Sequence, residues 1–316
     1  MNKKEVRNIL KRRYLEYNGY RNKEIRIMKA KRQVAGTLFT IAPVLVMGIF
    51  VFASFIIGIM LVFYKGKLTA DMSDIENNSM KNFALVGKDP MFKEAIIRTL
   101  KYAGIVTSIS IIASLIIAAI INGGKIKGKK VFLTIYFLPQ VTSAVASTII
   151  FYKIFGGDGA LGVNLAKNPK NIIYIIILAG LWVQISGSIV TFNTAFTNIG
   201  RTEYEAASLD GAGTMTKFFK ITLPALAPII AYQLMMTLIV SMAIFGQSFI
   251  VIALGISRPE DATTWSVLGF QHIIGAKGIV SNVGLGMIEL LSLGAAIFVL
   301  SIISNKIQPI DGKGKK

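Results

Sequence analysis

Long apolar stretches separated by short polar segments make up most of the chain after residue 34. A transmembrane helix needs about 20 predominantly apolar residues to cross the hydrocarbon core of a bilayer. Six stretches meet this requirement, and they cover residues 34–64, 99–121, 131–155, 172–196, 225–252 and 283–304. The pattern therefore predicts an all-α polytopic membrane protein with six transmembrane helices.

Basic residues are unevenly divided between the two sides of this predicted transmembrane domain, residues 34–304. With six spans, the tails 1–33 and 305–316 lie on one side, together with the loops 122–130 and 197–224. These four segments contain 23 Lys and Arg, whereas the three loops on the opposite side contain 10. Because an excess of Lys and Arg marks the cytoplasmic side of a membrane, we expect both termini to be cytoplasmic.

The composition supports a membrane protein and excludes several kinds of site. The 316 residues are 53% hydrophobic and only 16% charged, unlike an ordinary soluble domain. A net charge of +19 suggests nucleic acid in a soluble protein. Here a basic tail next to a span favours contact with anionic membrane lipid, and we expect no nucleic-acid partner. The absence of cysteine and the single histidine, His272, argue against a metal site or a catalytic triad.

The polar segment that begins at Thr202 predicts a short helix between two spans. Thr202 and Glu205 have the spacing of a capping box, in which each side chain satisfies a backbone N–H at the helix start. Gly211 and Gly213 are expected to end this helix after about two turns, because glycine readily adopts positive φ. Pro224 is then expected to begin the next helix.

The same segment resembles the EAA loop of permease subunits in binding-protein-dependent ABC importers, of the maltose or multiple-sugar type. The spacing between the motif positions fits throughout. The residues that carry the resemblance are Glu205, Ala206, Ala207, Asp210, Gly211, Ile221, Leu223 and Pro224. The resemblance implies the type I ABC importer permease fold, with loop 197–224 docking into a cleft of a separate ATPase subunit.

Further expectations about partners come from this resemblance alone. It implies two cytoplasmic ABC ATPase subunits, a second permease subunit in a heterodimer, and an extracytoplasmic solute-binding protein. The substrate would be a sugar or oligosaccharide. ATP would be used by the ATPase, so we expect no cofactor and no enzymatic activity in this chain. The location implied is a bacterial cytoplasmic or inner membrane.

Polar residues within the predicted spans are candidates for the translocation pathway, because polar groups in a membrane face protein or water. Those that recur on one helical face of the fourth or fifth span are Gln184, Ser188, Gln233, Thr237, Ser241 and Gln247. The same pattern also arises from interhelical hydrogen bonding, and both interpretations stand. In the last span, Glu289 either faces the pathway or is neutral or paired for structural reasons.

Two other classes of membrane protein fit the residues less well. A secondary transporter or channel would need coupling-ion sites, usually several buried carboxylates or broken spans in matched halves. A membrane enzyme would need a nucleophile with a base, or a metal cluster. Residues Gly123 to Lys129 match the start of a phosphate-binding loop, but no Ser or Thr follows and no buried strand precedes them.

Overall fold

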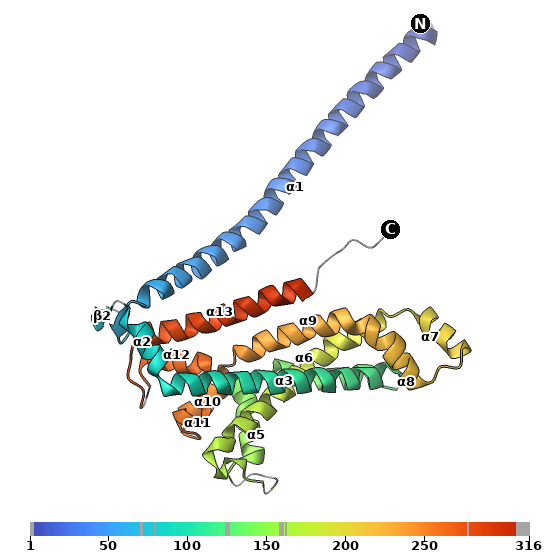
Figure 1. Ribbon diagram of the computed structural model, residues 1–316. Helices are drawn as coiled ribbons and strands as arrows, with labels where there is room; N and C mark the ends of the chain where they lie inside the picture. Colours follow the sequence, from blue (N-terminus) through green and yellow to red (C-terminus); the bar gives the residue numbers. More distant parts are fainter. Residues whose placement is uncertain are drawn as a thin grey trace. The chain divides into compact units, whose positions relative to one another are not determined.

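Helices form nearly all of the regular structure (Figure 1). The chain forms two units, Met1–Ile59 and Met60–Lys316. The computed structural model describes residues 3–69, 72–78, 80–123, 127–157, 161, 163–276 and 278–307.

The first unit consists of one helix, α1 (Lys3–Leu61), which ends just inside the second. This helix runs without a break from the basic tail into the first apolar stretch. The boundary predicted at residue 33 is therefore a change in composition and not a break in the helix. Its apolar part, Met28–Leu61, is long enough to cross a membrane. Pro43 lies within this part, where its missing N–H removes one helical hydrogen bond.

Four long helices lie side by side in the second unit (Figure 1). They are α3 (Pro90–Gly123), α6 (Ile172–Thr197), α9 (Leu223–Met242) and α13 (Val283–Ile307). Phe192 of α6 is fully buried in a cluster that also contains residues of α3 and α9. Gly180 lets α3 approach α6 closely, because an added Cβ would lie 2.1 Å from the hydroxyl of Tyr102.

The third predicted span is a bent pair of helices. The helices α4 (Lys129–Val141) and α5 (Ala144–Phe155) meet at an angle of 101°. Thr142 adopts an extended conformation. Ser143 then begins α5 as its N-cap, accepting a hydrogen bond from the N–H of Ala146 at 3.1 Å. The described chain thus has five helices able to span a membrane, or six if this pair is one span.

The fifth predicted span is longer and less regular than expected. It begins with α8 (Thr214–Lys217), continues through a π-helical turn, η3 (Phe218–Thr222), into α9, and ends with α10 (Gly246–Ala253). Pro224 lies in the first turn of α9, as expected, but α9 continues directly from η3, so helical structure already starts at Thr214. Proline has no N–H for the bond to the fourth preceding carbonyl, and a widened π-turn directly precedes it.

Short elements cover one end of the long helices. The all-α prediction is confirmed, and the described loops add one small hairpin of β1 (Tyr64–Gly66) with β2 (Ile75–Asn77). The other short elements are α2 (Lys81–Lys88), η1 (Leu165–Lys167), η2 (Pro169–Asn171), α11 (Pro259–Ala262) and α12 (Trp265–Ile274). Most of α12 is buried against α13, where the sequence predicted only a loop.

A buried asparagine fixes the start of this covered end. Asn82 of α2 donates hydrogen bonds to the carbonyls of Val62 and Tyr64, both at 2.8 Å. Its own side-chain oxygen accepts from Asn78 and from Asn282, which directly precedes α13. Because buried polar groups need partners, this one residue holds α2, the hairpin and α13 together.

Candidate functional site

The predicted short helix is present as α7 (Arg201–Leu209), between α6 and α8 (Figure 1). Its N-cap is Gly200, which offers no side-chain hydrogen bond. The capping box predicted for Thr202 and Glu205 is therefore wrong. Thr202 lies one residue inside the helix, where its hydroxyl cannot act as the N-cap acceptor.

Gly211 ends α7 as predicted. It has φ of 75°, and the following N–H, of Ala212, donates to the carbonyl of Ala207 at 2.9 Å. The N–H of Gly211 itself donates to the carbonyl of Ser208 at 3.2 Å. These two bonds make a Schellman motif, which favours glycine at this position. Gly213 differs from the prediction, because its φ of −71° is open to any residue and it serves as N-cap of α8.

Two side-chain hydrogen bonds tie α7 to the start of the fifth span. The hydroxyl of Tyr204 lies 2.7 Å from that of Thr222 in the π-turn. The ammonium of Lys217 in α8 donates to the hydroxyl of Ser208 at 2.7 Å. These bonds connect α7 to the segment that leads into α9. Sequence analysis missed these contacts, because neither pair has a helical spacing.

The outer surface of α7 combines acidic and apolar side chains. Glu203, Glu205 and Asp210 are exposed, and Leu209 is 90% exposed. Ala206 is exposed and Ala207 partly buried. No basic side chain of the described residues forms an ion pair with Glu205. The exposed face of α7 therefore carries three acidic side chains and one large apolar side chain.

An open groove of about 560 Å³ lies beside the start of α7, between α6 and α9. It is lined by Val190, Thr191, Thr194, Ala195, Asn198, Ile199, Gly200, Glu203, Ala225, Leu226 and Ile229. None of the seven predicted pathway residues is among them. The groove is therefore a feature of the α7 end of the molecule, and it does not identify the translocation pathway.

Three of the predicted pathway residues meet between α6 and α9. The amide of Gln233 donates to the hydroxyl of Ser188 at 3.0 Å and to that of Thr237 at 3.4 Å. Ser188 and Thr237 are buried. This geometry is interhelical hydrogen bonding, one of the two interpretations of the pattern. A role of these residues in the pathway stays a prediction.

The other predicted pathway residues of these spans do not join that cluster. Ser241 is buried, and its hydroxyl has no partner among the described residues. Gln184 and Gln247 are partly exposed. The expected common face of the fifth span does not reach Gln247, because the helix breaks between α9 and α10 and the period of 3.6 residues is lost there.

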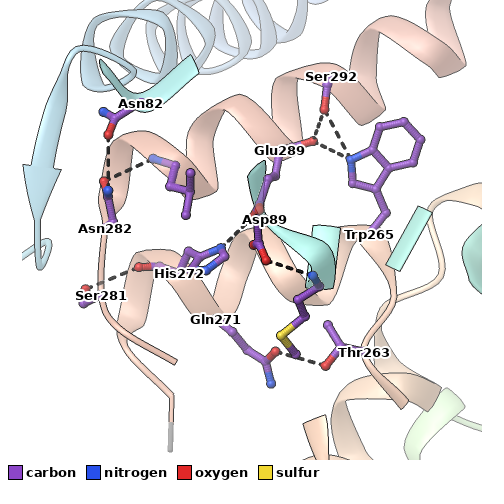
Figure 2. A network of polar contacts seen from close by, with 12 residues as sticks. Asn82, Asp89, Thr263, Trp265, Gln271, His272, Ser281, Asn282, Glu289 and Ser292 are labelled. Carbon is purple, nitrogen blue, oxygen red and sulfur yellow. Dashed lines mark hydrogen bonds and ion pairs between the residues drawn. The ribbon is translucent and has the colours of Figure 1, made fainter. Parts of the chain in front are cut away.

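Glu289 is paired inside the protein (Figure 2). It is 0% exposed, and its Oε2 lies 2.8 Å from Nδ1 of His272 in α12. Its backbone carbonyl accepts a hydrogen bond from the indole of Trp265 at 2.8 Å. Asp89, at the end of α2, lies close to the pair. Sequence analysis did not connect these residues, because they come from three distant segments.

Sequence comparison relates the chain to bacterial permease proteins, although no family model matches it. It is 27% identical over 289 residues to the arabinooligosaccharides transport system permease protein AraP of Bacillus subtilis (strain 168), covering 87% of this chain and 89% of the relative. It is 35% identical over 172 residues to the probable ABC transporter permease protein YesP of the same organism, covering 50% of this chain and 55% of the relative.

Comparison with solved structures gives the fold. A chain of a bacterial ABC transporter involved in the import of the acidic polysaccharide alginate aligns with a TM-score of 0.72 at 20% identity. The alignment covers 91% of this chain and all of that one. A bacterial alginate ABC transporter in complex with an alginate pentasaccharide-bound periplasmic protein aligns with a TM-score of 0.68 at 19% identity, covering 87% and 95%. In sequence the chain is similar to bacterial transport-system permease proteins, and it has the fold of a permease chain of an ABC importer.

Proposed function

We propose that this chain forms part of the translocation pathway for a sugar or oligosaccharide and couples it to a separate ATPase through α7. The observation that carries the coupling role is the geometry of α7, which is exposed, acidic and tied by two hydrogen bonds to the start of the fifth span. The substrate class is supported by the relative named for arabinooligosaccharides and by the alginate importer of similar fold.

The proposed mechanism assigns ATP binding and hydrolysis to two cytoplasmic ATPase subunits. α7 docks in a cleft of one of them and moves with it. Tyr204 and Ser208 pass this movement to Thr222 and Lys217, and α9 then changes its position against α6. An extracytoplasmic binding protein delivers the sugar to the pathway. The alginate transporter of similar fold, solved with its sugar-bound periplasmic protein, supports this part of the proposal.

A second permease subunit completes the pathway in this proposal. Many large apolar side chains of α3 and α9 are exposed in the single chain, among them Ile112, Ile120 and Val240. Lipid covers some of these side chains, and a partner permease covers others. We propose a heterodimer in a bacterial cytoplasmic membrane, with both termini of this chain in the cytoplasm.

Uptake of radiolabelled oligosaccharides by a strain lacking this chain tests the proposed function. We expect uptake of one class of sugar to be lost and to return with the wild-type chain. The wild-type chain should not restore sugar uptake when the ATPase carries a substitution that blocks ATP hydrolysis. Uptake that is unchanged by the deletion, or that is independent of the ATPase, contradicts the proposal.

The proposed orientation predicts opposite labelling at the two ends of the protein. The chain has no cysteine, so single-cysteine variants carry one reactive site each. Glu76→Cys in β2 should react with a membrane-impermeant thiol reagent in intact cells, because Glu76 is 72% exposed in a proposed external loop. Leu209→Cys in α7 should react only after the cells are opened. The reverse result would place α7 outside the cell, away from any ATPase.

The two polar residues Gln247 and Gln233 distinguish a pathway from a packing role. Gln233→Leu removes the bond to Ser188, which should lower the stability of the chain by about 1 kcal/mol. Gln247→Leu on α10 leaves that bond intact. If Gln247 lines the pathway, its variant should lower the apparent affinity for sugar about tenfold, a change of about 1.4 kcal/mol, in an assembled complex. Uptake measured over a series of sugar concentrations gives this apparent affinity. An unchanged curve for Gln247→Leu would support a packing role for Gln247, like that of Gln233.

A further inference from the structure

Three potential metal ligands converge at the covered end of the long helices, outside the coupling segment (Figure 2). Asp89 lies between α2 and α3, His272 in α12 and Glu289 in α13. Their ligand atoms, one from each residue, all lie within 4.8 Å of one another. The side chains point toward one another in Figure 2. The three residues belong to separate segments and are brought together only by the fold.

One carboxylate oxygen in this cluster lacks a partner. Oε2 of Glu289 is held by His272, and one oxygen of Asp89 accepts the backbone N–H of Met91 at 2.8 Å. Oε1 of Glu289 is buried and has no hydrogen-bond partner among the described residues. A buried polar atom without a partner is costly, and a bound water or ion is one way in which proteins satisfy it. The free oxygen belongs to the most deeply buried residue of the three.

The charges of the cluster favour a cation. Two carboxylates and one imidazole are present, and the ion pairs within the described segments are Lys65 with Glu76 and His272 with Glu289. No lysine or arginine of those segments therefore pairs with Asp89 or Glu289. With a neutral imidazole and both carboxyl groups ionised, the cluster would carry two negative charges, which a divalent cation neutralises. A carboxylate pair this close is otherwise strongly repulsive in a buried site.

We propose that Asp89, His272 and Glu289 bind a divalent transition-metal ion of the zinc type. Zinc takes imidazole nitrogen and carboxylate oxygen at about 2.0–2.2 Å, which places tetrahedral ligands about 3.3–3.6 Å apart. Nδ1 of His272 and Oε2 of Glu289, 2.8 Å apart, must therefore separate slightly, while the ligand atom of Asp89, within 4.8 Å of theirs, adjusts its position. Asp89 is only partly buried and ends a helix, so it is the residue that moves. Water fills the fourth position, and the ion joins α12 and α13 to the junction of α2 and α3.

Zinc binding to the full-length chain tests this proposal directly. His272 is the only histidine, and the chain has no cysteine, so a protein purified without a polyhistidine tag has little background. After treatment with a chelator, Zn²⁺ is titrated by calorimetry, and bound metal is counted by elemental analysis. We expect one saturable site per chain. The melting temperature should also rise with Zn²⁺ concentration, because an ion that binds only the folded state stabilises it.

Asp89→Asn is the sharpest variant for this test. Asparagine keeps an oxygen for the N–H of Met91 and leaves the pair of His272 with Glu289 in place, but it removes one charged ligand. Loss of even an outer-shell partner lowers metal affinity about 10–100-fold, so a fall of at least about 100-fold is expected here. Glu76→Gln removes an exposed carboxylate elsewhere and should bind Zn²⁺ like the wild type.

A spectroscopic measurement keeps the test independent of how the variants fold. Cu²⁺ bound to the wild-type chain should show electron paramagnetic resonance coupling to nitrogen of one imidazole. Absence of saturable Zn²⁺ binding, equal affinity in the wild type and a folded Asp89→Asn variant, or a bound Cu²⁺ without imidazole coupling would each overturn the proposal. The three residues would then be a hydrogen-bonded cluster that holds a proton instead of a metal.

Discussion

Replacing Gly211 with glutamate is expected to abolish sugar uptake while the chain remains in the membrane. Gly211 has φ of 75° and ends α7 in a Schellman motif. A side chain here is strained in that conformation, and glutamate adds a charge to the proposed ATPase contact. No atom of the described residues lies within 4 Å of the added Cβ, so the side chain itself causes no clash there and the main loss is expected in coupling. The measurements are sugar uptake, the amount of the chain in the membrane, and co-purification of the ATPase with it.

Two matched variants separate backbone strain from the effect of the charge. Gly213→Glu adds the same side chain two residues later, at φ of −71° and also without a neighbour within 4 Å. Gly211→Asn keeps the turn better, because asparagine tolerates positive φ. We expect the Gly211→Asn variant to retain most of the sugar uptake. The Gly213→Glu variant should retain more uptake than the Gly211→Glu variant does. Full docking and full substrate-stimulated ATP hydrolysis in Gly211→Glu would refute the coupling role of α7.

Glu205→Gln is expected to weaken docking of the ATPase about 30-fold or more. Truncating one partner of a buried charged contact across an interface costs about 2–5 kcal/mol. Glu205 is exposed in the single chain, and α7 begins without a capping box. The substitution should therefore leave the stability of α7 unchanged, since glutamine is as good a helix former as glutamate. Affinity of the purified permease for its ATPase measures the effect.

Glu203→Gln is the control for this prediction. Glu203 lies in the first turn of α7, where a negative charge stabilises the helix by about 0.3–1 kcal/mol at an exposed site. Its loss should change ATPase affinity by less than about fivefold. Equal effects of the two substitutions would mean that the charge of α7 acts as a whole, and unchanged affinity in Glu205→Gln would exclude Glu205 as a charged anchor.

The long helices could be predicted because hydropathy is a property of each segment alone. A stretch of about 20 apolar residues has no stable alternative to a helix inside a bilayer, where every backbone group must be satisfied internally. The apolar regions of α1, α3, α6 and α13 match their predicted stretches on this ground. The end of α7 at Gly211 was equally local, because it depends on the φ preference of one residue.

The breaks in the helices and the short buried helix could not be predicted in this way. The angle of 101° between α4 and α5 and the interruption between α9 and α10 lie within continuous apolar sequence. Apolar residues continue on both sides of each break. Likewise, α12 is buried by packing against α13, and its ten residues are too few to be distinguished from an apolar loop or re-entrant segment.

The sequence by itself determined the class of protein, the number of apolar stretches and the segment proposed to couple to an ATPase, because each rests on neighbouring residues. The tertiary structure decided which polar side chains meet. Gln233 reaches Ser188 across two helices, Tyr204 reaches Thr222, and Glu289 reaches His272 beside Asp89. Such contacts depend on the relative rotation and depth of packed helices, which many side chains fix together. No spacing within one segment encodes them.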